Sequence, residues 1–159
     1  MRPALLVLVL VLLSTADIAT TWYLLSKGLA VELNPFANST SISTLILSPV
    51  PRFLNLIFLL SVFLAEMYAD RFNAIVEKSY LHALIFLFPL YSILVIALAV
   101  ASNSALILGL PTPLPVFIRS FELLSDNPSV QITTAFSCIW LVSFPFLLKV
   151  ARVMYADNT

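Results

Sequence analysis

Four long apolar stretches dominate the sequence and leave little choice of fold. They lie at residues 4–26, 52–69, 79–102 and 130–154, close to the length of about 20 residues that a helix needs to cross a bilayer core. Hydrophobic residues make up 61% of the chain and charged residues 10%, whereas soluble domains carry about 25% charged residues. In lipid, only helices and closed barrels pair all their backbone groups. The sequence therefore predicts an all-α, polytopic membrane protein, with residues 1–159 forming one bundle of about four transmembrane helices.

The first apolar run has an alternative interpretation as a secretory signal peptide. Arg2 would be its basic flank, and the small residues 14–16 could pass as a cleavage site. However, the apolar helix continues through Trp22 and Tyr23, an aromatic pair typical of a membrane interface. We therefore expect this run to be a transmembrane helix.

The loops between the apolar stretches predict an orientation. An N-terminus on the cytoplasmic side places five basic residues inside and three outside. Those inside are Arg2, Arg71, Lys78, Lys149 and Arg152, and those outside are Lys27, Arg52 and Arg119. The positive-inside rule then favours N-in and C-in. The loop after the first helix and the third loop, residues 103–128, share the outer face in this orientation. Within the third loop, residues 116–124 are expected to form a short interfacial helix with Arg119 and Glu122 on its wet side.

Asp17 lies inside the first apolar run, where a carboxyl group is costly. Insertion scales put Asp at the bilayer centre at about +2.5 to +3.5 kcal/mol. On a helix, Asp17 shares one face with Thr20, Thr21 and Gly28. Gly28 is expected to end the helix, because glycine accepts the left-handed conformation of a C-terminal cap.

A polar turn follows Gly28 and contains Glu32, Asn34 and Pro35. Pro35 biases the backbone of Asn34 towards an extended conformation. The turn could therefore fold Glu32 and Asn34 back towards Asp17.

The spacing of these residues resembles the signature of a known family. Asp17 is followed by Thr20, then by Gly28, and then by Glu-Leu-Asn-Pro at 32–35. This pattern is similar to that of a family of small, functionally uncharacterised prokaryotic multi-pass membrane proteins. The resemblance implies a few packed transmembrane helices in a prokaryotic inner (plasma) membrane, and it implies no activity. The chain departs from the family in its length, its proline-rich third loop and its fourth apolar stretch.

Five polar residues make up the candidate ligand or ion site. They are Asp17, Thr20, Thr21, Glu32 and Asn34. Their oxygen atoms could bind a hard cation, bind a polar head group or pass a proton. The alternative is structural: the Asp17 carboxyl bonds to Thr21 or to loop amides and locks the first helix to its loop. The sequence leaves both alternatives open, and with them the identity of any metal.

The sequence carries no pattern typical of an enzyme or a nucleic-acid-binding protein. It has no His pair for zinc, no Gly-x-Ser-x-Gly elbow and no glycine-rich phosphate loop. A single cysteine, Cys138, excludes an intrachain disulfide and a multi-cysteine metal site. The net charge is zero, with no basic stripe for nucleic acid. No catalytic residue and no cofactor are therefore predicted.

Two functions fit a small, charge-poor chain of this kind. The favoured one is an accessory or assembly subunit that packs against a larger membrane complex, with the polar site on the outer face. The alternative is a small oligomeric transporter or channel that uses Asp17 for cation or proton coupling. The expected partners are the lipid bilayer and either a protein partner or further copies of the chain.

Overall fold

The computed structural model describes residues 3–29, 49–78 and 82–156, which form helices joined by short turns. The helices are α1 (Pro3–Ser26), α3 (Pro49–Met67), the 3-10 turn η1 (Ala69–Arg71), α4 (Phe72–Lys78), α5 (Leu84–Ile107), α6 (Pro113–Arg119) and α7 (Pro128–Ala156). No strand occurs within the described ranges. The all-α prediction is therefore confirmed.

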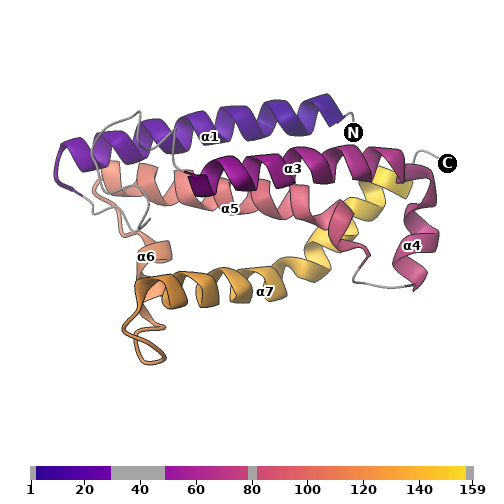
Figure 1. The fold of residues 1–159 in the computed structure, drawn as a ribbon. Coiled ribbons are helices and arrows are strands. Elements are labelled where there is room, and N and C mark those ends of the chain that lie inside the picture. The colour runs from indigo at the N-terminus through magenta and orange to yellow at the C-terminus, as the bar shows by residue number, and fades with distance from the viewer. Residues whose placement is uncertain (1–2, 30–48, 79–81, 157–159) are drawn as a thin grey trace.

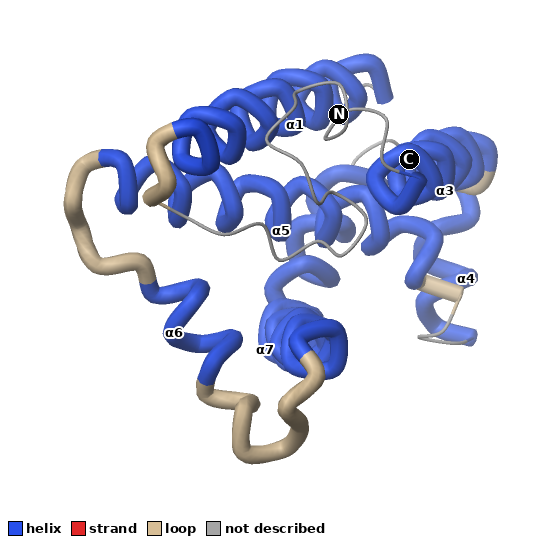
Figure 2. The backbone as a smooth tube through the Cα atoms, turned by 60° about the vertical axis from the view of Figure 1, so that its left-hand side comes forward, coloured by secondary structure: helices blue, strands red, loops and turns tan. Residues whose placement is uncertain are grey.

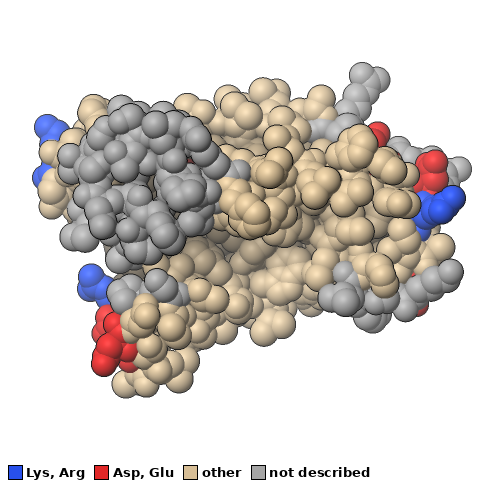
Figure 3. Space-filling model, in the orientation of Figure 1, with Lys and Arg blue, Asp and Glu red and all other residues tan. Residues whose placement is uncertain are grey.

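Several of these helices are long and apolar enough to cross a membrane. Three qualify on their own, namely α1, α5 and α7. The fourth candidate is a bent pair of helical segments, Phe53–Met67 in α3 and Ala69–Glu77 after it, with an angle of 66° between the two. Figure 3 shows charged side chains gathered at two ends of one face, with an uncharged band between them. The chain is therefore a small membrane protein with three spans, or four if the bent pair counts as one.

The four long helices alternate in direction around α5. Figure 1 shows the start of α1 and the end of α7 near α4, at what we call the α4 end. Helices α1 and α5 finish at the opposite end, called here the α6 end, where α6 leads into α7. Helix α5 packs against α1, α3 and α7, whereas no Cα atom in the described part of α7 comes within 8 Å of one in α1 or α3. The bundle is therefore a three-helix unit of α1, α3 and α5, with α7 attached to one side.

Aromatic rings close the core at the α4 end. Phe86 of α5 is fully buried, with its ring centroid 5.0 Å from that of Phe72 and 5.1 Å from that of Tyr155. Both ring pairs meet edge to face, an arrangement that aromatic quadrupoles favour. Ala65 and Ala151 are also fully buried here, and such small side chains let helix backbones approach closely. This cluster ties α5 and α7 to the turn between α3 and α4.

The two glycines of the chain end the two parallel helices at the α6 end. Gly28 follows α1 at φ 65°, and Gly109 follows α5 at φ 71°. After α1, the Leu29 N–H donates to the Leu24 carbonyl at 2.9 Å, and the equivalent bond after α5 is also 2.9 Å. This is the Schellman pattern of a helix C-terminus. The prediction that Gly28 stops the first helix is confirmed.

Replacing either glycine with Ala is expected to destabilise the protein by about 1 kcal/mol, because a left-handed conformation costs an L-residue about that much. Among the described residues beyond the chain neighbours, no atom lies within 4 Å of the Cβ that would be added, so the expected loss comes from backbone strain. Thermal unfolding in detergent, followed by circular dichroism, measures the loss for Gly28→Ala and Gly109→Ala. An unchanged melting temperature would contradict the cap geometry.

Several helix boundaries differ by a few residues from those expected from the sequence, including the start of the third long helix, which is Leu84 instead of residue 79. Two of the differences concern the third loop. The third helix runs to Ile107, beyond the expected end at residue 102, because its stop signal is Gly109. The short helix expected at 116–124 lies earlier, at Pro113–Arg119. A proline at the first helical position is preset for helix and lacks only an N–H that would be unpaired there. The first shift moves residues 103–107 into α5. The second moves residues 113–115 into α6 and leaves residues 120–124 outside it.

Candidate functional site

A polar cluster joins α1 to α5 inside the bundle, and its centre is Asn103. The Asn103 side-chain nitrogen lies 3.3 Å from Asp17 Oδ1, 3.3 Å from Thr20 Oγ1 and 3.1 Å from Thr21 Oγ1. All four side chains are half-buried. Three candidate residues on α1 thus converge on one amide group from α5. We call this set the Asp17–Asn103 cluster.

Hydrogen-bonding capacity decides which way the Asn103 amide points. The Thr20 hydroxyl donates to the backbone carbonyls of Ala16, at 2.9 Å, and Asp17, at 3.1 Å. Its oxygen is therefore left to accept from Asn103. An ionised Asp17 carboxylate also only accepts. The NH₂ group of Asn103 must therefore face α1, since its carbonyl oxygen would meet two acceptors there.

The cluster lies within the helical part of the bundle, near its α6 end. Asn103 is four residues before the last residue of α5, which places it about 6 Å inside that helix end at 1.5 Å per residue. Backbone and side-chain polar groups at such a depth need partners within the protein. Hydrogen bonds to a charged group contribute about 1.5–3 kcal/mol in proteins, and those between membrane helices average about 0.6 kcal/mol. The cluster therefore adds a polar contact to the packing of α1 against α5.

The structure separates the five predicted site residues into two groups. Asp17, Thr20 and Thr21 are brought together, as their shared helical face requires. Glu32 and Asn34 lie outside the described residues. Asn103 was missed, because the sequence interpretation ended the third helix at residue 102. The signal that could have found it is Gly109, a helix stop of the same kind as Gly28.

The Asn103 nitrogen at the centre of the cluster limits which ligands the cluster can bind. Three oxygen atoms converge where the Asn103 nitrogen sits, so a cation could take that place only if the amide moved aside. Within the described part of the chain, no three His, Cys, Asp or Glu side chains come together to hold a metal ion. The contacts seen link α1 to α5, whereas the structural alternative expected the Asp17 carboxyl to lock the first helix to its own loop. The donor in this link is Asn103 on α5, and residues 30–48 of the loop after α1 lie outside the described residues.

Several serine and threonine hydroxyl groups elsewhere in the spans bond back to their own helix. Thr134 donates to the Val130 carbonyl at 2.8 Å, and Ser137 to the Thr133 carbonyl at 2.8 Å. Such back-bonding lets a hydroxyl sit in an apolar segment without a partner on another helix. These hydroxyls therefore differ from Thr20 and Thr21, which also meet a side chain from another helix.

A second contact holds α7 to α5 at mid-length. The Tyr91 hydroxyl on α5 donates to the Phe136 carbonyl at 2.7 Å. The Tyr91 ring meets Trp140 edge to face, with centroids 4.6 Å apart. A groove of about 670 Å³ runs beside this contact, with a mostly apolar lining. Its lining includes Phe88, Thr133 and Ser137.

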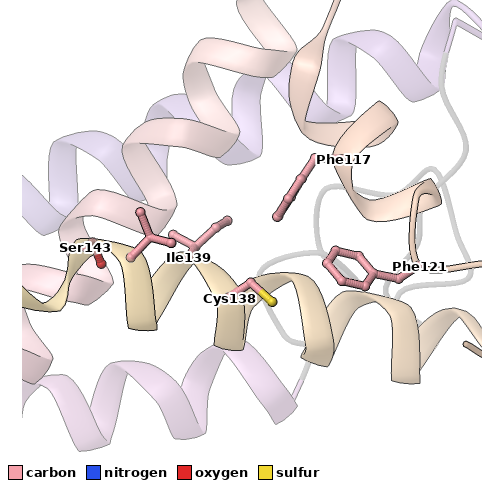
Figure 4. Close-up of a pocket in the computed structure, with 6 residues that line it drawn as sticks. Phe117, Phe121, Cys138, Ile139 and Ser143 are labelled. Carbon is pink, nitrogen blue, oxygen red and sulfur yellow. The ribbon is translucent and has the colours of Figure 1, made fainter.

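Another groove, of about 390 Å³, lies on α7 beneath α6. Phe117 and Phe121 cover it from the α6 side, while Cys138, Ile139 and Val142 line it from α7. Figure 4 shows both phenyl rings directed towards α7, with Cys138 below them. The surface that the lining exposes to the groove is apolar. The first half of α7 is thus flanked by two open apolar grooves.

Neither groove has the features of a catalytic centre. The groove beside Tyr91 contributes only hydroxyl groups and one indole, and the one beneath α6 contributes Ser143 and Cys138 as its heteroatom-bearing side chains. Comparison of the chain with protein-family models, curated proteins and solved structures found no match.

Proposed function

We propose that this protein is an accessory or assembly subunit that packs against a larger membrane complex through α7. One observation carries the proposal: the first half of α7 stands apart from α1 and α3 (Figure 2), and a groove opens on each side of it. Protein interiors are close-packed, with few voids. An incompletely packed helix is therefore typical of a surface that another helix completes.

The exposed side of α7 suits contact with a membrane helix. Leu141 and Val142 are 70% and 82% exposed. Thr133 and Ser137 lie on the same helix one turn apart, and small residues at this spacing let a neighbouring backbone approach closely. Shape and dispersion contacts drive helix association in lipid, where burial of apolar surface contributes little.

The Asp17–Asn103 cluster supports this function by making the scaffold rigid. It holds α1 to α5, and α5 carries α7 through the Tyr91 contact. In the proposed N-in and C-in orientation, the cluster belongs to the outer half of the bundle. Glu32 and Asn34 would complete the polar site on that face.

The transport alternative has its own supporting observation. Three oxygen atoms from Asp17, Thr20 and Thr21 converge on one point at membrane depth. If a cation or proton displaced Asn103 there, an oligomer of this chain could couple that event to transport. The packing of α7 gives no support to this function, so we place it second.

Native electrophoresis of the protein, extracted from its membranes in mild detergent, tests the proposal. We expect the 17.6 kDa chain to migrate in a much larger assembly, and Val142→Trp to release it because the larger side chain blocks close approach. The matched control is Leu12→Trp on the lipid-facing side of α1, where the residue is 61% exposed and the assembly should persist.

Migration of the wild-type chain as a monomer would overturn the accessory function. A homodimer whose Asp17→Asn form loses substrate-dependent proton release would favour transport. Retention of the Val142→Trp form in the assembly would show that α7 is not the docking helix.

A further inference from the structure

We propose that residues 108–126 form a membrane-surface element that inserts apolar side chains into the boundary between lipid head groups and acyl chains. This segment connects α5 to α7 and includes α6. The proposal concerns lipid contact alone, and it does not depend on the accessory function.

The segment exposes large apolar side chains outside the long helices. Leu123 is 96% exposed, Leu124 69%, Val116 70% and Leu108 73%. Single exposed apolar residues are ordinary, but a group of them in one short connection marks an interaction surface. These side chains lie beyond the last residue of α5 and before the first residue of α7. They therefore sit at the level where the spans leave the lipid.

The backbone holds these side chains in place. After α6, successive turns are closed by bonds from the Glu122 N–H to the Arg119 carbonyl at 2.9 Å and from the Leu124 N–H to the Phe121 carbonyl at 3.0 Å. Gln131 at the start of α7 is nearly buried, and its amide donates to the Ser125 carbonyl at 2.8 Å. The exposure of Leu123 and Leu124 is thus part of an ordered turn.

A different set of side chains anchors the element to the bundle. Ile118 is buried, and the rings of Phe117 and Phe121 meet edge to face at 5.3 Å over the α7 groove. Figure 4 shows these rings pointing towards α7. The anchor therefore uses Phe117, Ile118 and Phe121. The side chains of Val116, Leu123 and Leu124 remain exposed.

Charged side chains are placed as a bilayer surface requires. Arg119, Glu122 and Asp126 are all exposed. In Figure 3, the blue and red atoms beside the α6 end lie at its outer edge, and uncharged atoms lie between them and the middle of the molecule. An element lying in a membrane interface has its charges towards water and its apolar residues towards the acyl chains. Val130, near the start of α7, is also exposed, at 44%.

Site-directed spin labelling of the full chain tests the proposal directly. The chain has one cysteine, so Cys138→Ala provides a label-free background. Single cysteines are then placed at Leu123, Leu124 and Asp126 and labelled. The protein is reconstituted in vesicles of phosphatidylcholine with a minor share of phosphatidylglycerol. A label at Leu141, which faces outward from α7, serves as the lipid reference.

The measurement compares collision of each label with oxygen, which partitions into lipid, and with a water-soluble nickel complex. We expect the labels at Leu123 and Leu124 to favour oxygen severalfold, as at Leu141, and the label at Asp126 to favour nickel. Equal nickel access at Leu123 and Asp126 would place the turn in water and overturn the proposal. Protection of Leu123 from both reagents would indicate a protein partner on this surface, and would overturn it as well.

Discussion

Phe86→Ala is expected to lower the free energy of unfolding by about 3 kcal/mol, at the lower end of the range for deleting a buried ring. Phe86 is fully buried, and its ring touches those of Phe72 and Tyr155. Part of the usual cost is absent, because a membrane protein gains little from moving a ring out of lipid. The lost dispersion contacts and the cavity remain. Unfolding in mixed micelles with increasing dodecyl sulfate measures the loss.

The matched control for Phe86→Ala is Phe63→Ala on α3. Phe63 is 61% exposed, so its ring faces the surroundings in the folded bundle. Its removal is expected to change stability by less than about 0.5 kcal/mol, as for ordinary surface positions. Equal losses for the two variants would contradict the aromatic core at the α4 end.

Asn103→Leu is expected to cost about 2 kcal/mol, because it removes the amide donor while the Asp17 carboxylate remains within the bundle. Thr20 and Thr21 lose the same donor. The cost of desolvating the carboxylate is then less well offset. The same unfolding titration measures the change.

Asn55→Leu on α3 provides the control for Asn103→Leu. Asn55 is exposed in the bundle, and the substitution is chemically identical. In detergent or lipid, this replacement is expected to be neutral or stabilising, because it removes a polar group from the apolar face of a span. Destabilisation of similar size at both positions would argue against a special role for Asn103.

The fold class could be predicted because it depends on length and hydropathy. A run of some 20 apolar residues has few structural options in lipid, and its helix is specified by local backbone pairing. Gly28 was recognised as a helix stop for the same local reason. The face shared by Asp17, Thr20 and Thr21 follows from helix periodicity, and the structure keeps it.

The contact between Asp17 and Asn103 could not be predicted while the third helix was expected to end at residue 102. Ser102, Asn103 and Ser104 look like the start of a loop by composition, although they continue α5. Gly109 marks the real end of that helix, and its spacing from Asn103 was the available clue. Which helix lies next to α1 depends on tertiary packing, and hydropathy carries no information on it. The grooves beside α7 depend on packing in the same way.

The most direct test of the account is a double-mutant cycle between Asp17 and Asn103. Changing both residues to Leu removes the carboxylate and its amide donor together, and such paired replacement is often nearly neutral. We therefore expect the double variant to recover about 1–2 kcal/mol of the loss predicted by adding the two single changes, within the range of coupling for residues in contact. Strict additivity of the two losses would mean that the side chains do not interact, and the polar link between α1 and α5 would not exist.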